Sequence, residues 1–307
     1  MATKRVVFLG TGGTIAGRAG NAADNVGYRA GEVPVADILA AIAGMPERLQ
    51  GAALGSEQIA QVDSKDMDWS VWQLLAHACQ RNLQDEEVAG IVITHGTDTI
   101  EETAFFLQSV LRPGKPVVLT CAMRPATALV PDGPQNLLDA VAVAGDPRAS
   151  GVLAVCAGSV HAAEHVAKVH TYRVDAFDSG DAGPMGVVEE GQVRWFHAPQ
   201  TPPQGAVFDA QRLLRLQQAV AMPRVHWLTS HADADGAQVL ALLAYGEAHP
   251  ELMPHGLVVA GTGNGTLHHA LEAALQEAQT RGLVVWRGSR CARGRVIPGL
   301  AGAMADT

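Results

Sequence analysis

The sequence predicts an α/β protein in which parallel strands alternate with helices. Two observations support this: short aliphatic runs recur along the chain, and helical segments with start signals lie between them. The runs are almost continuously apolar, as expected for strands buried on both faces of a sheet. They occupy residues 6–9, 91–94, 117–120, 152–156, 225–230, 257–260 and 283–286.

The helical segments carry recognisable first turns. Asp68 is placed to cap a helix that continues through Trp72 and Leu75. Either Asp98 or Thr99 opens a helix over residues 100–111, where two glutamates in the first turn interact favourably with the helix dipole. Pro134 suits the first turn of a third helix. This alternation of strands and helices predicts a doubly wound parallel sheet.

Length and charge limit the functions open to the chain. The 307 residues leave room for about two domains at roughly 150 residues each. The 22 basic and 31 acidic residues give a net charge of −9, which excludes binding to a phosphate backbone and therefore a nucleic-acid partner. We expect no membrane partner, because no apolar run approaches the ~18 residues that span a bilayer. The run at 6–9 is too short for a signal-peptide core, so we expect a cytoplasmic protein, or a periplasmic one if a signal peptide has been removed.

A change in composition predicts the domain boundary. The segment APQTPPQG at 198–205 interrupts the α/β pattern, and strands resume at residue 225. We expect an N-terminal catalytic domain over residues 1–197, a linker over 198–222 and a smaller C-terminal domain over 223–307. The four cysteines lie far apart, and the histidines lack the spacing of a metal motif, so we expect neither a metal site nor a dense disulfide framework.

Glycine- and threonine-rich loops follow several strands, at the sheet edge where ligands of parallel sheets bind. They read GTGGT at 10–14, HGTD at 95–98, CAMR at 121–124 and GTGNGT at 261–266. The first loop lacks the third glycine of a dinucleotide motif because residue 15 is isoleucine. The chain also lacks a P-loop and a G-x-S-x-G motif, and we expect no cofactor.

Two threonines in these loops, Thr14 and Thr97, are candidate nucleophiles, and Asp98 follows the second. A threonine hydroxyl needs a base to take its proton. His95 is expected to leave the strand on another side from Thr97, whereas Lys168 could turn back to the same edge as a proton-relaying base. The residues alone leave open whether the threonines are catalytic or only cap turns.

Two long segments, GTGGTIAG at 10–17 and ITHGTDTIEETA at 93–104, resemble the signature segments of the bacterial-type L-asparaginases. Shorter stretches are similar to the same family from residue 5 to about residue 296: VDSKDM at 62–67, TCAMRP at 120–125, DGPQNLLDAV at 132–141 and GLVVAGTGNGT at 256–266. The resemblance implies a homotetrameric amidohydrolase, built as a dimer of intimate dimers. It also implies a flavodoxin-like N-terminal domain and a smaller, Rossmann-like α/β C-terminal domain.

The resemblance assigns roles by position. Thr14 matches the primary nucleophile, and Tyr28 matches the tyrosine of a mobile lid that helps to activate it. Thr97, Asp98 and Lys168 match a second cluster of the family. In that cluster the lysine and the threonine work as a proton relay, and the aspartate holds the substrate's α-amino group. Ser64 matches the residue that binds the α-carboxylate, and Ala122 one whose carbonyl contacts the side-chain amide. Further substrate-binding positions are Gly13, Gly96 and Lys65.

The implied reaction is hydrolysis of L-asparagine to L-aspartate and ammonia through an acyl-enzyme, with backbone N–H groups of the glycine loops stabilising the oxyanion. A mixed glutaminase–asparaginase is the alternative, because the two substrates differ by one methylene. A non-catalytic amino-acid-binding protein is a third interpretation.

Several positions depart from the family pattern. Lys65 stands where Gln or Glu usually holds the α-amino group, and its charge opposes the substrate ammonium, which predicts weaker substrate binding. Thr266 replaces an Asn that reaches the neighbouring subunit, and Cys121 replaces a glycine. The family's C-terminal-domain Glu has no match. Family members continue past the region of Arg290 through another strand and a helix, so we expect the C-terminal domain to be truncated at its end.

Overall fold

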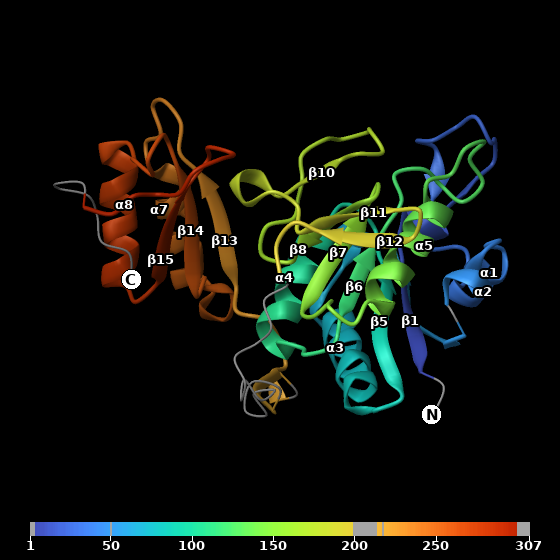
Figure 1. The fold of residues 1–307 in the computed structure, drawn as a ribbon. Helices are drawn as coiled ribbons and strands as arrows, with labels where there is room; N and C mark the ends of the chain where they lie inside the picture. Colours follow the sequence, from blue (N-terminus) through green and yellow to red (C-terminus); the bar gives the residue numbers. More distant parts are fainter. Residues whose placement is uncertain (1–3, 50, 199–213, 217, 300–307) are drawn as a thin grey trace. The chain divides into compact units, whose positions relative to one another are not determined.

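The structure is a computed structural model that describes residues 4–49, 51–198, 214–216 and 218–299 (Figure 1). The chain divides into two units, residues 1–219 and 220–307, which we describe separately. Residues 199–213 and 217 of the expected linker lie outside the described part, and the linker at 198–222 stays a prediction. Both units combine a sheet with helices, so the predicted mixed α/β class is confirmed.

The first unit is built on an eight-stranded sheet, counted over the described residues, in the order β12-β11-β8-β7-β6-β5-β1-β4. Five neighbouring strands are parallel to one another: β7, β6, β5, β1 and β4. The other three, β8, β11 and β12, run antiparallel to their neighbours. In chain order they are β1 (Arg5–Gly12), β4 (Ala53–Val62), β5 (Val88–Thr94), β6 (Val117–Thr120), β7 (Val152–Cys156), β8 (Ser159–Ala162), β11 (Gly186–Glu189) and β12 (Gln192–Trp195).

Helices cover both faces of this sheet, as the doubly wound prediction requires. On one face, α3 and α4 bury residues such as Leu75 and Leu107 against Ile93 of β5. On the other face, α1, α2 and α5 form a second core, in which Leu137 packs with Val92. These helices are α1 (Val35–Ala40), α2 (Met45–Arg48), α3 (Trp69–Gln84), α4 (Ile100–Leu111) and α5 (Gly133–Gly145). Adjacent strand residues thus enter opposite cores, which is why the central strands are continuously apolar.

The predicted helix starts are present in the structure. The side chain of Asp68 accepts a hydrogen bond from the backbone N–H of Val71 and so caps α3. Thr99 is the N-cap residue of α4, which settles the choice between Asp98 and Thr99. Pro134 lies in the first turn of α5.

Sequence analysis did not identify β4 and the three antiparallel strands. Most β4 residues are exposed or half-buried because this strand lies at the sheet edge, so it lacks a continuous apolar run. The antiparallel strands have four residues each, too few for alternation to be read in the sequence.

The second unit contains a parallel sheet in the order β13-β14-β15, formed by β13 (Val225–Thr229), β14 (Gly256–Gly261) and β15 (Val284–Ser289). Two helices, α7 (Ala237–Ala248) and α8 (His269–Thr280), pack on the face that carries Leu228, Val259 and Val285. On the opposite face, Trp227 and Trp286 are 73% and 64% exposed. Over the described part of the chain, no helix has the length and apolar character needed to cross a bilayer.

Candidate active site

The predicted site residues of the first unit lie in loops at one edge of its sheet. Thr14 begins a short 3-10 helix, Thr14–Ala16, directly after β1, and Ser64 begins another, Ser64–Asp66, after β4. Thr97 and Asp98 join β5 to α4. Because β4, β1 and β5 are parallel neighbours, their carboxyl ends meet at the same edge.

Two glycines allow the loops to approach one another closely. Gly13 has a φ of +79°, and a Cβ placed on it would lie 2.4 Å from the backbone of Gly96. A Cβ on Gly96 would lie 2.4 Å from the hydroxyl oxygen of Ser64. Any larger residue at either position would push the loops apart, so glycine is required where the loops of Thr14 and Thr97 touch.

The candidate nucleophile is bonded to the predicted lid tyrosine. The hydroxyl oxygens of Thr14 and Tyr28 are 2.6 Å apart. Tyr28 belongs to a small antiparallel hairpin made of β2 (Arg18–Ala19) and β3 (Tyr28–Arg29). Thr14 is buried, so this hairpin closes over its side chain.

The hairpin is held by a second loop. The backbone N–H of Ala19 donates to the hydroxyl of Thr127 at 2.9 Å, and that of Leu129 donates to the carbonyl of Ala22 at 3.0 Å. Hydrogen bonds with the loop at 127–129 therefore hold the hairpin that carries Tyr28.

A lysine, a threonine and an aspartate form the second cluster. The Nζ of Lys168 donates to the hydroxyl oxygen of Thr97 at 2.8 Å and to the Oδ1 of Asp98 at 2.5 Å. The Lys168 side chain is 19% exposed and that of Asp98 is 53% exposed. The hydrogen bond from Lys168 lowers the pKa of Asp98, against the opposing effect of burial. Asp98 is therefore a carboxylate at neutral pH.

Glu101 holds the backbone of Lys168, a role that sequence analysis missed. Its Oε2 accepts a hydrogen bond from the backbone N–H of Lys168 at 2.6 Å. Lys168 lies in β9 (Ala167–Lys168), which pairs with β10 (Phe177–Asp178). In the sequence, Glu101 is noticeable only as an acidic residue in the first turn of a helix. The favourable interaction with the helix dipole already accounts for an acidic residue there, so nothing indicated a contact with Lys168.

Ser64 is bonded to the same cluster. Its hydroxyl oxygen accepts from the backbone N–H of Asp98 at 3.1 Å, and its carbonyl accepts from the hydroxyl of Thr99 at 2.7 Å. The Ser64 hydroxyl hydrogen is left available for a further acceptor. Ala122, the other predicted binding residue of this group, is buried two residues after the end of β6.

Lys65 is paired with its own neighbours in the sequence. Its Nζ donates to Asp66 at 2.8 Å and to Asp63 at 3.0 Å, and its side chain is 60% exposed. The hydrogen bond to Asp66, followed by that to Asp63, raises the pKa of Lys65. The positive charge that the sequence places here is thus offset by two carboxylates.

His95 is buried and neutral. Burial lowers its pKa to about 4. Its Nε2 lies 2.9 Å from the hydroxyl of Thr103, which also accepts from the indole N–H of Trp72 at 2.9 Å. Its Nδ1 lies 2.8 Å from the carbonyl of Gly96. A neutral ring here donates from Nδ1 to Gly96 and accepts at Nε2 from Thr103, and so fixes the peptide of Gly96.

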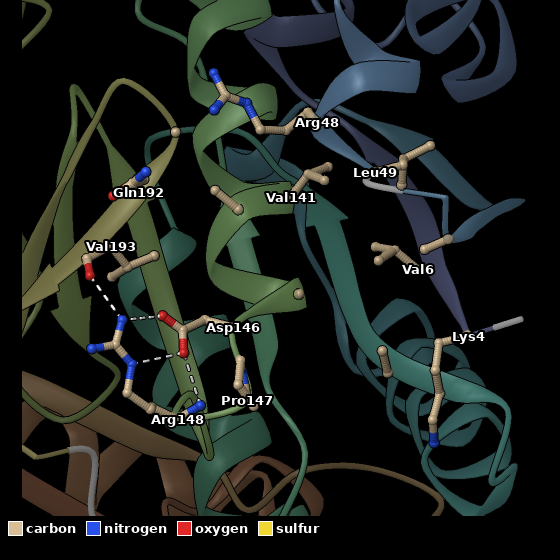
Figure 2. Close-up of a pocket in the computed structure, with 15 residues that line it drawn as sticks. Lys4, Val6, Arg48, Leu49, Val141, Asp146, Pro147, Arg148, Gln192 and Val193 are labelled. Carbon is tan, nitrogen blue, oxygen red and sulfur yellow. Dashed lines mark hydrogen bonds and ion pairs between the residues drawn. The ribbon is translucent and has the colours of Figure 1, made fainter. Parts of the chain in front are cut away.

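A hollow of about 610 Å³, drawn in Figure 2, lies elsewhere. Lys4, just before β1, and the segment 146–148, just before β7, line it, which places it at the amino ends of the strands. Within it, Arg148 donates to Asp146 at 2.7 Å and to the carbonyl of Val193 at 2.9 Å. None of the predicted site residues lines this hollow.

The predicted residues thus form two bonded groups that meet where Gly13 touches Gly96. One group contains Thr14 and Tyr28, and the other contains Ser64, Thr97, Asp98 and Lys168. Thr266 is in the second unit, where its hydroxyl bonds to that of Thr262 at 2.9 Å. Over the described residues, no group of three or more His, Cys, Asp and Glu side chains is arranged to hold a metal ion.

Comparison with known proteins identifies the family. The Asparaginase, N-terminal family model matches residues 5–201, and the Glutaminase/Asparaginase C-terminal domain model matches residues 224–306. The chain is 36% identical to a glutaminase-asparaginase of Pseudomonas fluorescens biotype A, over 95% of this chain and 77% of that protein. It is 35% identical to L-asparaginase 2 of Escherichia coli (strain K12), over 96% of this chain and 80% of that protein.

A solved structure agrees with these sequence matches. The crystal structure of a probable cytoplasmic L-asparaginase from Campylobacter jejuni has a TM-score of 0.85 and 35% identity to this chain, and the match covers 97% of this chain and 88% of that one. Both family models, the relatives and the fold agree with the motifs at 10–17 and 93–104. The chain belongs to the glutaminase/asparaginase family.

Proposed function

We propose that this protein is an L-asparaginase, which hydrolyses L-asparagine to L-aspartate and ammonia through an acyl-enzyme on Thr14. The observation that carries the proposal is the pair of hydroxyls at one sheet edge, each with its own proton partner. Thr14 is bonded to Tyr28, and Thr97 is bonded to Lys168. The names of the relatives, L-asparaginase and glutaminase-asparaginase, support the same chemistry.

In the first half of the reaction, the Thr14 hydroxyl attacks the side-chain carbonyl carbon of the substrate. Tyr28, at 2.6 Å, is placed to take this proton while its own phenolic proton passes to the departing nitrogen. Backbone N–H groups of the loops around Gly13 and Gly96 stabilise the oxyanion, the contribution that is usually largest in acyl transfer. Ammonia then leaves, and the aspartyl group remains as an ester on Thr14.

In the second half, water attacks the ester and releases aspartate. Lys168 and Thr97 relay the protons, because the Lys168 ammonium donates to the Thr97 hydroxyl and that hydroxyl lies 3.3 Å from Asp98. A proton can pass along the hydrogen bonds of Lys168, Thr97 and Asp98 between solvent and the reacting atoms.

The same residues suit a zwitterionic substrate. The half-exposed Asp98 carboxylate is placed to bind the α-amino group. Ser64 accepts from Asp98 and still has a hydroxyl hydrogen for the α-carboxylate. The family resemblance assigns to the carbonyl of Ala122 the contact with the side-chain amide of the substrate. Lys65 borders this site with its charge shared between Asp63 and Asp66.

The assembly and the location of the protein belong to the same proposal. We propose a homotetramer, which sedimentation velocity of the purified chain would test. The relatives include a probable periplasmic L-asparaginase of Haemophilus influenzae and the cytoplasmic protein of Campylobacter jejuni. We propose the cytoplasm, and fractionation of cells that produce the protein would test it.

The decisive experiment measures ammonia and aspartate released from L-asparagine by the purified chain, and ammonia from L-glutamine at the same low concentration. We expect asparagine to be the better substrate. Thr14→Ala should lower kcat by at least about 1,000-fold, as loss of a nucleophile does, while Thr14→Ser should keep measurable activity. Full hydrolysis by Thr14→Ala would overturn the mechanism, and equal release from both amides would favour a mixed glutaminase–asparaginase. Absence of hydrolysis with retained asparagine binding would favour a binding protein.

A further inference from the structure

Two buried cysteines lie side by side at the catalytic edge of the sheet. Cys121 directly follows β6, and Cys156 is the last residue of β7. Their sulfur atoms are 3.3 Å apart. Both are free thiols, as are Cys79 and Cys291. The proposed mechanism uses none of the four.

The strand register produces this contact. β6 and β7 are parallel, with Thr120 paired to Val155, so Cys121 and Cys156 form the next pair of the same ladder. Both side chains enter the core beneath α3 and α4. Neighbouring strands are about 4.8 Å apart, which falls within the roughly 4.4–6.8 Å between Cα atoms that a disulfide spans.

We propose that Cys121 and Cys156 are an oxidation site, which a hydroperoxide converts to a disulfide, and that this disulfide lowers the activity of the adjacent active site. In the first step the thiolate of one cysteine attacks an oxygen of hydrogen peroxide and the O–O bond breaks, which gives a sulfenic acid and hydroxide. The hydroxide takes up the proton that the thiol lost and becomes water. In the second step the other thiolate attacks the sulfenic sulfur, an S–S bond forms, and the S–O bond breaks to release hydroxide, which becomes water with the proton that the second thiol lost. The two sulfurs lose two electrons, and the peroxide gains them.

The consequence for activity rests on the proposed function. Ala122, whose carbonyl is assigned to the substrate amide, is the residue after Cys121. The carbonyl of Cys121 itself accepts from the Nδ2 of Asn136 at 2.9 Å. A disulfide must bring the sulfurs from 3.3 Å to about 2.0 Å, which pulls Cys121 toward β7. A displacement of this size next to a substrate contact costs roughly 10- to 100-fold in rate.

The environment of the pair sets the pH dependence of the oxidation. The hydrogen bond with Cys156 and burial raise the pKa of Cys121 well above its usual range. Since the thiolate is the reacting form, oxidation is slow at neutral pH and faster in alkaline solution.

The test uses the purified full chain, first reduced and then treated with hydrogen peroxide at pH 7 and pH 9 while folded. Remaining thiols are alkylated under denaturing conditions, and peptides are mapped without reduction. We expect a pair of peptides joined through Cys121 and Cys156, with a mass two hydrogen atoms below the sum of the two reduced peptides. This pair should form faster at pH 9 than at pH 7 and should disappear after treatment with dithiothreitol. Cys156→Ala should not form it, whereas the matched variant Cys291→Ala should.

Ammonia release is the second readout. Oxidised wild type and Cys291→Ala should lose at least about tenfold in kcat and regain it with dithiothreitol, and Cys156→Ala should resist. The oxidation site is refuted if both cysteines stay alkylatable under treatment that oxidises the exposed Cys291. The effect on activity is refuted if the disulfide forms and the rate is unchanged. If even the reduced protein releases no ammonia, the proposed function fails, while the peptide map still tests the disulfide.

Discussion

The phenol oxygen of Tyr28 lies 2.6 Å from the hydroxyl oxygen of Thr14. Two short strands position this contact, because β2 and β3 pair Arg18 with Arg29 and Ala19 with Tyr28. The two hydroxyls are thus 14 residues apart in sequence, and a small hairpin brings them together. In the proposed mechanism, the hairpin that carries Tyr28 therefore takes part in the proton chemistry.

Tyr28→Phe removes the proton acceptor and keeps the ring. We expect kcat for asparagine to fall roughly 100-fold, as for loss of a general base, with a much smaller change in KM. Steady-state ammonia release measures both constants. A kcat within twofold of wild type would show that Tyr28 only covers the site.

Glu101 tests whether Lys168 has to be held through its backbone. Glu101→Ala removes the acceptor of the Lys168 N–H, and we expect kcat to fall roughly tenfold because the relay is misplaced. Glu101→Gln keeps an acceptor oxygen and should restore most of the activity. Glu102→Ala, an exposed neighbour in the same helical turn, is the matched control and should behave as wild type. Equal activity of Glu101→Ala and Glu102→Ala would contradict the positioning role.

Lys65 tests the effect of a charge near the substrate ammonium. Lys65→Gln removes the cation and leaves the carboxylates of Asp63 and Asp66 to attract the ammonium. We expect KM for asparagine to fall severalfold with kcat unchanged. Pairing with the two carboxylates keeps the effect well below the ~3–4 kcal/mol of two fixed like charges at a distance of ~4–6 Å. An unchanged or higher KM would show that Lys65 has no repulsive effect.

Two buried histidines predict how stability depends on pH. Burial lowers the pKa of both His95 and His161 from 6.5 to about 4. Between these values the unfolded chain binds protons that the folded protein excludes, so stability rises with pH through this window and is lost as pH falls from 6.5 toward 4. The slope is about 1.4 kcal/mol per pH unit for each histidine.

Urea unfolding at pH 6.5, 5.5 and 5.0 measures this slope. His161→Gln should reduce it by the share of one histidine, because Gln does not titrate and can keep the hydrogen bond to Ser179 that His161 makes at 2.8 Å. An exposed control, His197→Gln, should leave the slope unchanged. The same slope in wild type and His161→Gln would mean that His161 does not titrate as its burial requires.

The sequence by itself determined the central architecture. Strands β5, β6 and β7 could be predicted because burial on both faces forces each residue to be apolar, and that requirement is local. The helix start at Asp68 could be predicted because capping involves only the first turn, and the second start could be narrowed to Asp98 or Thr99, of which the structure selects Thr99. The motifs that identify the family could also be read in the sequence, because each loop carries its own glycines and its own reactive side chain in one contiguous segment.

Only the tertiary structure decided which distant residues touch. The bonds of Lys168 to Thr97 and Glu101, and the sulfur contact of Cys121 with Cys156, join positions between 35 and 71 residues apart. Such contacts depend on strand order and register, which no local pattern encodes. The antiparallel strands β8, β11 and β12 were missed for the same reason: a four-residue strand is stabilised by the neighbour with which it pairs.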